Sequence, residues 1–209
     1  MALPLLSLGI GVFACCLNAI FIRFFKKMGS LSSGQRGEVR WASRSKPLVG
    51  GLTFFISFLA AGFLLLIGPV GLPVAELHAV RALALAGALG FALGLADDAY
   101  NTRPLLKLAG QTSCGLILLA FGQGIAATGL PVLDAALTLL WVVGIMNSFN
   151  MLDNMDGVSG SLSLAIHVLA LAVMAILGET GSFFFGLLLA MAAAHVAFLA
   201  FNWHPSRMY

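Results

Sequence analysis

Apolar residues gather in seven long runs that are separated by shorter polar stretches. The runs cover residues 3–23, 48–68, 80–96, 109–128, 132–147, 162–178 and 183–202. Each run is continuous, without the apolar–polar alternation of a membrane β-strand, and most approach the ~20 residues that a membrane-spanning helix needs. The pattern therefore predicts an all-α fold, a polytopic transmembrane helix bundle of about seven spans that forms a single domain over residues 1–209.

Composition narrows the class of protein further. The chain is 60% hydrophobic and only 9% charged, and its mean hydropathy is +1.02. A water-soluble domain cannot cover a core of this size with so few charges. We therefore expect the chain to lie in the lipid bilayer, with no nucleic acid as a partner. A homodimer is the assembly we consider for it.

The basic residues give the bundle an orientation. If the seven spans alternate in direction, every Lys and Arg except Arg81 falls on one side, most of them in the loop at residues 23–47. Positive residues favour the cytoplasmic side, so the N-terminus is expected outside. The first run has its positive residues after it and none before it, which is typical of a membrane anchor rather than of a cleaved signal peptide.

A first acidic pair stands where one span ends and the next begins, in GLADDAYNTRPLLKLAGQ at residues 94–111. Adjacent residues on a helix point about 100° apart, so Asp97 and Asp98 are expected to do different jobs. One could hold a cation, while the other handles a proton or positions a nucleophile. Arg103 and Lys107 are spaced i, i+4, which fits either a clamp for phosphate or a pair of snorkelling membrane anchors.

A second polar cluster ends a later span, in MNSFNMLDNMDG at residues 146–157. Its members are Asn147, Asn150, Asp153 and Asp156. A step of three residues keeps them in one stripe at a helix end, and Gly157 and Gly160 are expected to free the backbone to turn. Oxygen ligands suit a hard cation, and Mg²⁺ typically takes one or two carboxylates and completes its shell with water and phosphate.

Two further polar segments fall on the same side of the predicted bundle. RSKPLVGGL, residues 44–52, places Lys46 before a pair of glycines, and FNWHPSRMY, residues 201–209, offers His204 and Arg207. Alone, the first is ordinary helix-start chemistry and the second a polar terminus. Together the four patches supply carboxylates, amides and cations at the depth of a lipid headgroup, which indicates phosphoryl chemistry between a soluble nucleotide and a membrane lipid.

Other features of the spans indicate structure rather than chemistry. Gly87, Gly90 and Gly94 have the small-residue spacing of close helix packing in membranes. His167 and His195 lie inside spans, where we expect neutral imidazoles hydrogen-bonded between helices. A transporter is disfavoured, because transporters place their ionisable residues near the bilayer midplane and this chain places them at span ends.

The four segments resemble the polyprenyl-phosphate N-acetylhexosamine-1-phosphate transferases, which are of the glycosyltransferase family 4 type. The resemblance rests on D-D-x₅-P-x₂-K-x₃-Q, on N-x₂-N-x₂-D-x₂-D-G, and on KPLVGG and FNWHPSRMY, in that family's topology. It implies a bacterial multi-pass cytoplasmic-membrane enzyme with a cytoplasmic active face. Such an enzyme moves a sugar-1-phosphate from a UDP-N-acetylhexosamine to undecaprenyl phosphate, releases UMP, and uses Mg²⁺ or Mn²⁺.

The resemblance also implies roles for individual residues. Asp97 and Asp98 would be the paired aspartates, which deprotonate or orient the lipid phosphate or attack directly in a two-step scheme, and Lys107 would bind phosphate. The predicted metal ligands are Asp97, Asp98, Asp153 and Asp156. The predicted substrate contacts are Lys46, Asn147, Asn150, Asp153, Asp156, His204 and Arg207.

The branch and the extent of the resemblance are two further expectations. NMLDNMDG looks closer to the N-acetylglucosamine-1-phosphate transferases of O-antigen and teichoic-acid synthesis than to the muramyl-pentapeptide branch. The sequence ends at Tyr209, before the family's Met-Gly-Asp with its metal-binding Asp. It therefore resembles the first two-thirds of that fold, as a fragment, a short form completed by another chain, or a non-catalytic paralogue that serves as a lipid-phosphate-binding scaffold.

Overall fold

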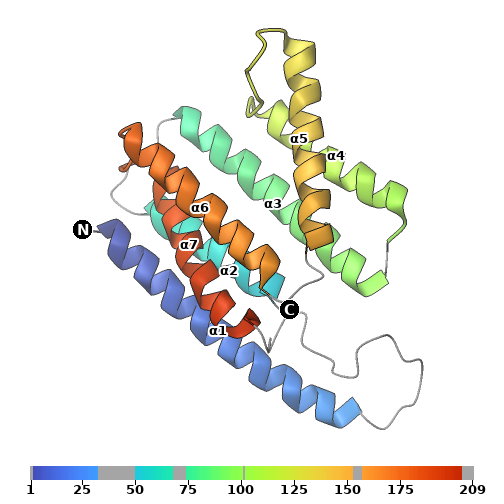
Figure 1. Ribbon diagram of the computed structural model, residues 1–209, viewed down its shortest axis with the longest axis vertical. Helices are drawn as coiled ribbons and strands as arrows, with labels where there is room; N and C mark the ends of the chain where they lie inside the picture. Colours follow the sequence, from blue (N-terminus) through green and yellow to red (C-terminus); the bar gives the residue numbers. More distant parts are fainter. Residues whose placement is uncertain (1, 33–49, 68–73, 101, 153–156, 204–209) are drawn as a thin grey trace. The chain divides into compact units, whose positions relative to one another are not determined.

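A computed structural model describes residues 2–32, 50–67, 74–100, 102–152 and 157–203, and every regular element in these ranges is a helix (Figure 1). The helices are α1 (Ala2–Ser32), α2 (Gly50–Ile67), α3 (Val74–Tyr100), α4 (Pro104–Ala120), α5 (Pro131–Leu152), α6 (Val158–Ile176) and α7 (Phe183–Asn202). The predicted all-α class is confirmed.

Six of these helices are long and apolar enough to cross a membrane, and α4, with 17 residues, is apolar but shorter. The predicted run at 109–128 is misplaced, because α4 begins at Pro104 and ends at Ala120. Proline suits the first position of a helix, whereas Gly122, with φ of 74°, follows the last turn in a left-handed conformation. Helices α3 and α5 extend beyond the predicted runs, so Asp97, Asp98 and Asn150 lie within helices.

The described helices fall into two compact units. The first contains α1, α2, α6 and α7, and the second contains α3, α4 and α5. Each unit is described by itself below.

In the first unit, α7 packs against α1, α2 and α6. Small residues permit close approach at these contacts. A Cβ added at Gly186 would lie 2.9 Å from the Cδ2 atoms of Leu3 and Leu65, and one at Gly160 would lie 3.0 Å from Cδ2 of Leu199. Helices in lipid associate mainly through such tight packing. Gly160 therefore serves helix contact inside α6, and the expectation that it frees the backbone to turn is wrong.

Gly157 does make the expected turn, with φ of 75° immediately before α6. Its backbone N–H donates to Oδ1 of Asn202 at 2.8 Å. Asn202 is buried at the end of α7, so this bond joins the last residue of the acidic segment to the first polar residue of the C-terminal segment. Gly157 and Asn202, which are 45 residues apart in the sequence, thus meet in the first unit.

In the second unit, α4 packs against both α3 and α5. Gly110 faces the side chain of Leu93, and a Cβ added at Gly115 would lie 2.8 Å from Cδ2 of Leu139. The sequence prediction put close packing at Gly90 and Gly94. A Cβ at Gly94 would have no neighbour within 4 Å and one at Gly90 would meet only Cε of Met146, at 3.6 Å. The close-packing glycines of this unit therefore lie on α4.

The histidines in the spans also differ from expectation. Nδ1 of His167 lies 2.7 Å from the Ser163 carbonyl oxygen, and Nδ1 of His195 lies 2.9 Å from that of Met191. Each imidazole is thus bonded within its own helix. The two rings contact each other across α6 and α7, with centroids 4.7 Å apart.

We predict that Asn202→Leu lowers the free energy of unfolding by about 1–3 kcal/mol, because it leaves the buried N–H of Gly157 unpaired. Equilibrium unfolding of the detergent-solubilised chain in SDS measures this loss. Ser161→Ala is the matched control. It also removes a bond to Gly157, but the Gly157 carbonyl still accepts the Ser161 N–H. Equal losses in the two variants would contradict the assignment.

Candidate active site

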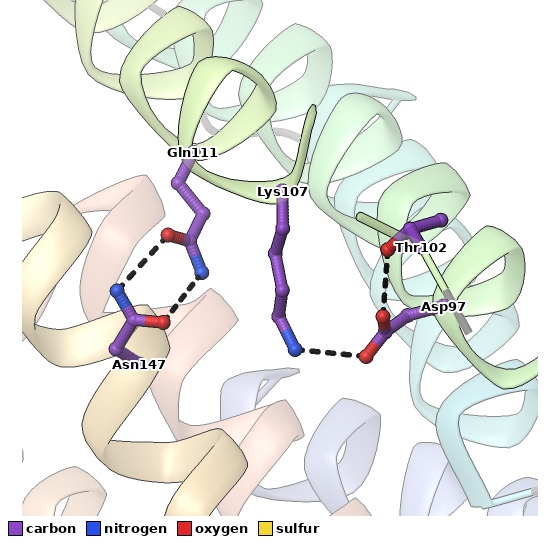
Figure 2. A network of polar contacts seen from close by, with 5 residues as sticks. All are labelled: Asp97, Thr102, Lys107, Gln111 and Asn147. Carbon is purple, nitrogen blue, oxygen red and sulfur yellow. Dashed lines mark hydrogen bonds and ion pairs between the residues drawn. The ribbon is translucent and has the colours of Figure 1, made fainter. Parts of the chain in front are cut away.

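The last turn of α3 and the start of α4 meet through the carboxylate of Asp97 (Figure 2). Nζ of Lys107 lies 2.8 Å from Oδ2 of Asp97, and Oγ1 of Thr102 donates to Oδ1 at 2.6 Å. The Asp97 and Lys107 side chains remain about a quarter exposed, at 26% and 24%. Both oxygens of Asp97 therefore have a bonding partner. The ion pair with Lys107 is partly exposed to solvent.

The local sequence explains why these groups meet. Arg103 has extended φ and ψ angles of −61° and 140°, the conformation that a residue before proline prefers. Pro104 then begins α4, and the Arg103 carbonyl accepts the N–H groups of Leu106 and Lys107 to close the first turn. Lys107, in this first turn, lies beside the end of α3 and reaches Asp97.

The two charges occupy the helix ends that disfavour them. A carboxylate is destabilised near a helix C-terminus and an ammonium near an N-terminus, because of the helix dipole. Asp97 lies in the last turns of α3 and Lys107 in the first turn of α4. Helix stability alone therefore does not account for this placement, and the contact between the charges offsets it.

A second polar contact joins α4 to α5. Nε2 of Gln111 donates to Oδ1 of Asn147 at 3.2 Å, and Nδ2 of Asn147 donates to Oε1 of Gln111 at 3.0 Å (Figure 2). Gln111 is 3% exposed, whereas Asn147 is exposed. Gln111 follows Lys107 by one helical turn. Two polar side chains on successive turns of α4 therefore contact different neighbours, Lys107 contacting α3 and Gln111 contacting α5.

The opposite ends of these helices carry polar groups that bond to backbone. Oδ1 of Asp134 accepts the N–H of Thr128 at 2.9 Å, and Oγ1 of Thr138 accepts the N–H of Ile125 at 2.9 Å. These contacts order the loop between α4 and α5. The DD segment and the amides of the later segment thus share the other end of the second unit.

The structure brings some of the predicted residues together. Asp97 meets Lys107, Asn147 meets Gln111, and Asp98 and Asn150 are exposed. Lys46, Asp153, Asp156, His204 and Arg207 lie outside the described residues. Of Arg103 and Lys107, only Lys107 lies within α4, because Arg103 precedes the helix in an extended conformation.

Sequence reasoning missed Thr102 and Gln111 as members of the site. Gln111 is part of the D-D-x₅-P-x₂-K-x₃-Q spacing, and its position four residues after Lys107 was the available signal. Thr102 carried no such signal, since it lies between the two helices.

The acidic groups of the described residues fit a magnesium ion in part. In this part of the chain no three His, Cys, Asp or Glu side chains come together as a metal site. Asp98 is an exposed carboxylate, and each oxygen of Asp97 keeps a second lone pair beyond its bond to Thr102 or Lys107. One or two carboxylates are what Mg²⁺ takes from many proteins.

The helices and this site define a multi-pass membrane protein with acidic, cationic and amide side chains gathered at one end of a helical unit. The model of the family described as glycosyl transferase family 4 matches residues 80–209, and the chain belongs to this family. The match includes every side chain drawn in Figure 2.

Curated relatives include enzymes of two kinds. The chain is 26% identical to the probable undecaprenyl-phosphate N-acetylglucosaminyl 1-phosphate transferase of Bacillus subtilis, over 92% of this chain and 53% of the relative. It is 27% identical to the decaprenyl-phosphate N-acetylglucosaminephosphotransferase of Mycobacterium tuberculosis, over 78% and 45%. It is 28% identical to the phospho-N-acetylmuramoyl-pentapeptide-transferase of Streptococcus pneumoniae, over 98% and 67%. The chain spans about half the length of the first two relatives.

We predict that Asp97→Asn and Lys107→Met each change the free energy of unfolding by no more than about 1 kcal/mol, because the ion pair is partly exposed. The double variant should lose less than the sum of the two, since either change already breaks the pair. SDS unfolding in detergent measures all three. Arg103→Met, which removes an exposed cation four residues away, should be additive with Asp97→Asn. Additivity of the Asp97 and Lys107 variants would contradict the pairing.

Proposed function

We propose that this chain transfers N-acetylglucosamine-1-phosphate from UDP-N-acetylglucosamine to undecaprenyl phosphate and releases UMP. Membership of glycosyl transferase family 4 supports a transferase, and two of the relatives carry an N-acetylglucosamine phosphate transfer in their names. The observation that carries the proposal is the Asp97–Lys107 pair beside the amides of α5, at one end of a unit of apolar helices. A lipid phosphate and a soluble nucleotide can meet only at such an end.

The reaction is a phosphoryl substitution. An oxygen of the lipid phosphate attacks the phosphorus that bears the sugar, and the bond from this phosphorus to the bridging oxygen breaks. The bridging oxygen leaves with UMP. Most of the catalytic effect in such transfers comes from positioning and from neutralising charge on phosphate oxygens. The Lys107 ammonium is the cation available for this purpose among the groups of Figure 2.

The two aspartates take different roles in this proposal. Asp97 is bonded to Thr102 and Lys107, so its carboxylate orients the ammonium toward an incoming phosphate. Asp98 is exposed on the same turn of α3 and meets the substrates. It would accept a proton from the lipid phosphate or orient it, or attack directly in a two-step scheme.

A magnesium ion, with manganese as the alternative, is the proposed cofactor. Asp98 would hold it together with Asp153 and Asp156. Asp97, which keeps its bonds to Thr102 and Lys107, would offer the second lone pair of an oxygen. Such an ion supplies Lewis-acid neutralisation of diphosphate charge. Asn147 and Asn150 present amides to the nucleotide, and Lys46, His204 and Arg207 are the proposed further phosphate contacts.

We place the protein in the bacterial cytoplasmic membrane with this site on the cytoplasmic face. The distribution of Lys and Arg along the sequence supports that orientation. The relative from Streptococcus pneumoniae favours a second candidate, transfer of phospho-N-acetylmuramoyl-pentapeptide. A chain that binds the lipid phosphate without turnover is the non-catalytic alternative.

A transfer assay tests the proposal. The detergent-solubilised chain is mixed with undecaprenyl phosphate, Mg²⁺ and UDP-[¹⁴C]GlcNAc, with and without EDTA. Labelled lipid and UMP should form in equal amounts and disappear with EDTA. A parallel reaction with UDP-N-acetylmuramoyl-pentapeptide separates the two branches. A folded chain that binds undecaprenyl phosphate but forms no product from either donor would contradict a transferase.

We predict that Asp98→Asn, Asp153→Asn and Asp156→Asn each lower the transfer rate by about 10²–10³, the typical effect of losing one group that stabilises a transition state. Glu76→Gln is the control, because Glu76 lies at the other end of α3. SDS unfolding should show that all four variants remain folded. Full activity in Asp98→Asn would overturn its assignment.

A further inference from the structure

The reciprocal bonds between Gln111 and Asn147 constrain the direction of an exposed amide. Each side chain gives one N–H and receives one, at 3.2 Å and 3.0 Å. If one amide turned over by itself, its NH₂ group would face the other NH₂ group and its oxygen would face the other oxygen. Both hydrogen bonds would then be lost. The two amides can therefore turn over only together.

The two members of the pair differ in their exposure to solvent. Gln111 is 3% exposed and lies on the face of α4 that packs against its neighbours, whereas Asn147 is exposed on α5. A side-chain amide has two N–H donors and two carbonyl lone pairs. After pairing, Asn147 retains one N–H donor and one oxygen lone pair. The bonds to the buried Gln111 side chain fix the direction in which these two groups point.

The position of the pair links it to the proposed chemistry. Gln111 is one turn from Lys107 on α4, and Asn147 is one turn from Asn150 on α5. Figure 2 shows the amide pair and the Asp97–Lys107 pair side by side along α4. The direction of the Asn147 amide is thus set on the same helix that carries the proposed phosphate-binding cation.

We propose that Gln111 is a positioning residue, which orients the amide of Asn147 toward the nucleotide half of the UDP-sugar. This inference rests on the proposed function. Gln111 does not touch substrate itself, since it is buried. Its effect passes through Asn147 and is confined to the donor, because the lipid acceptor has no nucleotide.

Gln111→Leu tests the inference, since it removes both bonds and keeps a side chain of similar size. The KM for UDP-sugar should rise about tenfold, the effect of one neutral hydrogen bond, while the KM for undecaprenyl phosphate stays unchanged. Asn147→Leu should raise the donor KM similarly, and the double variant should be no worse than Asn147→Leu alone. The exchanged pair, Gln111→Asn with Asn147→Gln, should recover most of the donor affinity.

Ser113→Ala on α4 is the matched control, because Oγ of Ser113 donates to the Ala109 carbonyl of its own helix. It should leave both KM values unchanged. A purely structural role of Gln111 would lower the SDS midpoint and the active fraction of Gln111→Leu but leave its donor KM as in the wild type, and that result would overturn the inference alone. Absence of transfer by the wild-type chain would overturn the proposed function and this inference with it.

Discussion

The ion pair between Asp97 and Lys107 is the contact on which the arrangement of the candidate site depends. It joins the end of α3 to the start of α4, whose first residue is Pro104, and it sets two charges against the dipoles of their own helices. A partly exposed pair contributes little to stability. We therefore propose that the placement serves binding, because an incoming phosphate can compete with Asp97 for the Lys107 ammonium.

The short helix α4 connects the ion pair to the rest of the unit, because it packs against both α3 and α5. Gly110 and Gly115 let it approach α3 and α5 closely, and Lys107 and Gln111 then contact those two helices from successive turns. Side-chain bonds of about 3 Å tolerate little displacement of the backbones that carry them. The polar contacts at the end of the unit therefore depend on the tight packing in its apolar part. The sequence of α4 must satisfy both requirements together.

The sequence was sufficient for the all-α class, because continuous apolar runs decide it. Helical geometry was also sufficient to place Asp97 and Asp98 in different surroundings, the first in an ion pair and the second exposed, while the roles assigned to them stay predictions. It misjudged helix ends, since an apolar run stops at the first polar residues while α3 and α5 continue through them to Tyr100 and Leu152. The amide pair joins residues 36 apart, so it depends on the rotation of α4 against α5. No pattern within a single helix reports that rotation. For the same reason the sequence pattern selects Gly90 and Gly94, whereas the close contacts lie at Gly110 and Gly115.

The two ends of the second unit solve the same physical problem differently. Polar groups near lipid must find partners, because an unpaired one is costly there. Between α4 and α5, Asp134 and Thr138 bond chiefly to backbone N–H groups, which are fixed by the fold. At the other end, Asp97, Lys107, Gln111 and Asn147 bond to one another through side chains. Side-chain partners can be exchanged for those of a ligand without unfolding a helix, whereas backbone partners cannot. The end of the unit whose polar groups satisfy each other is therefore the end at which we propose that a polar substrate binds.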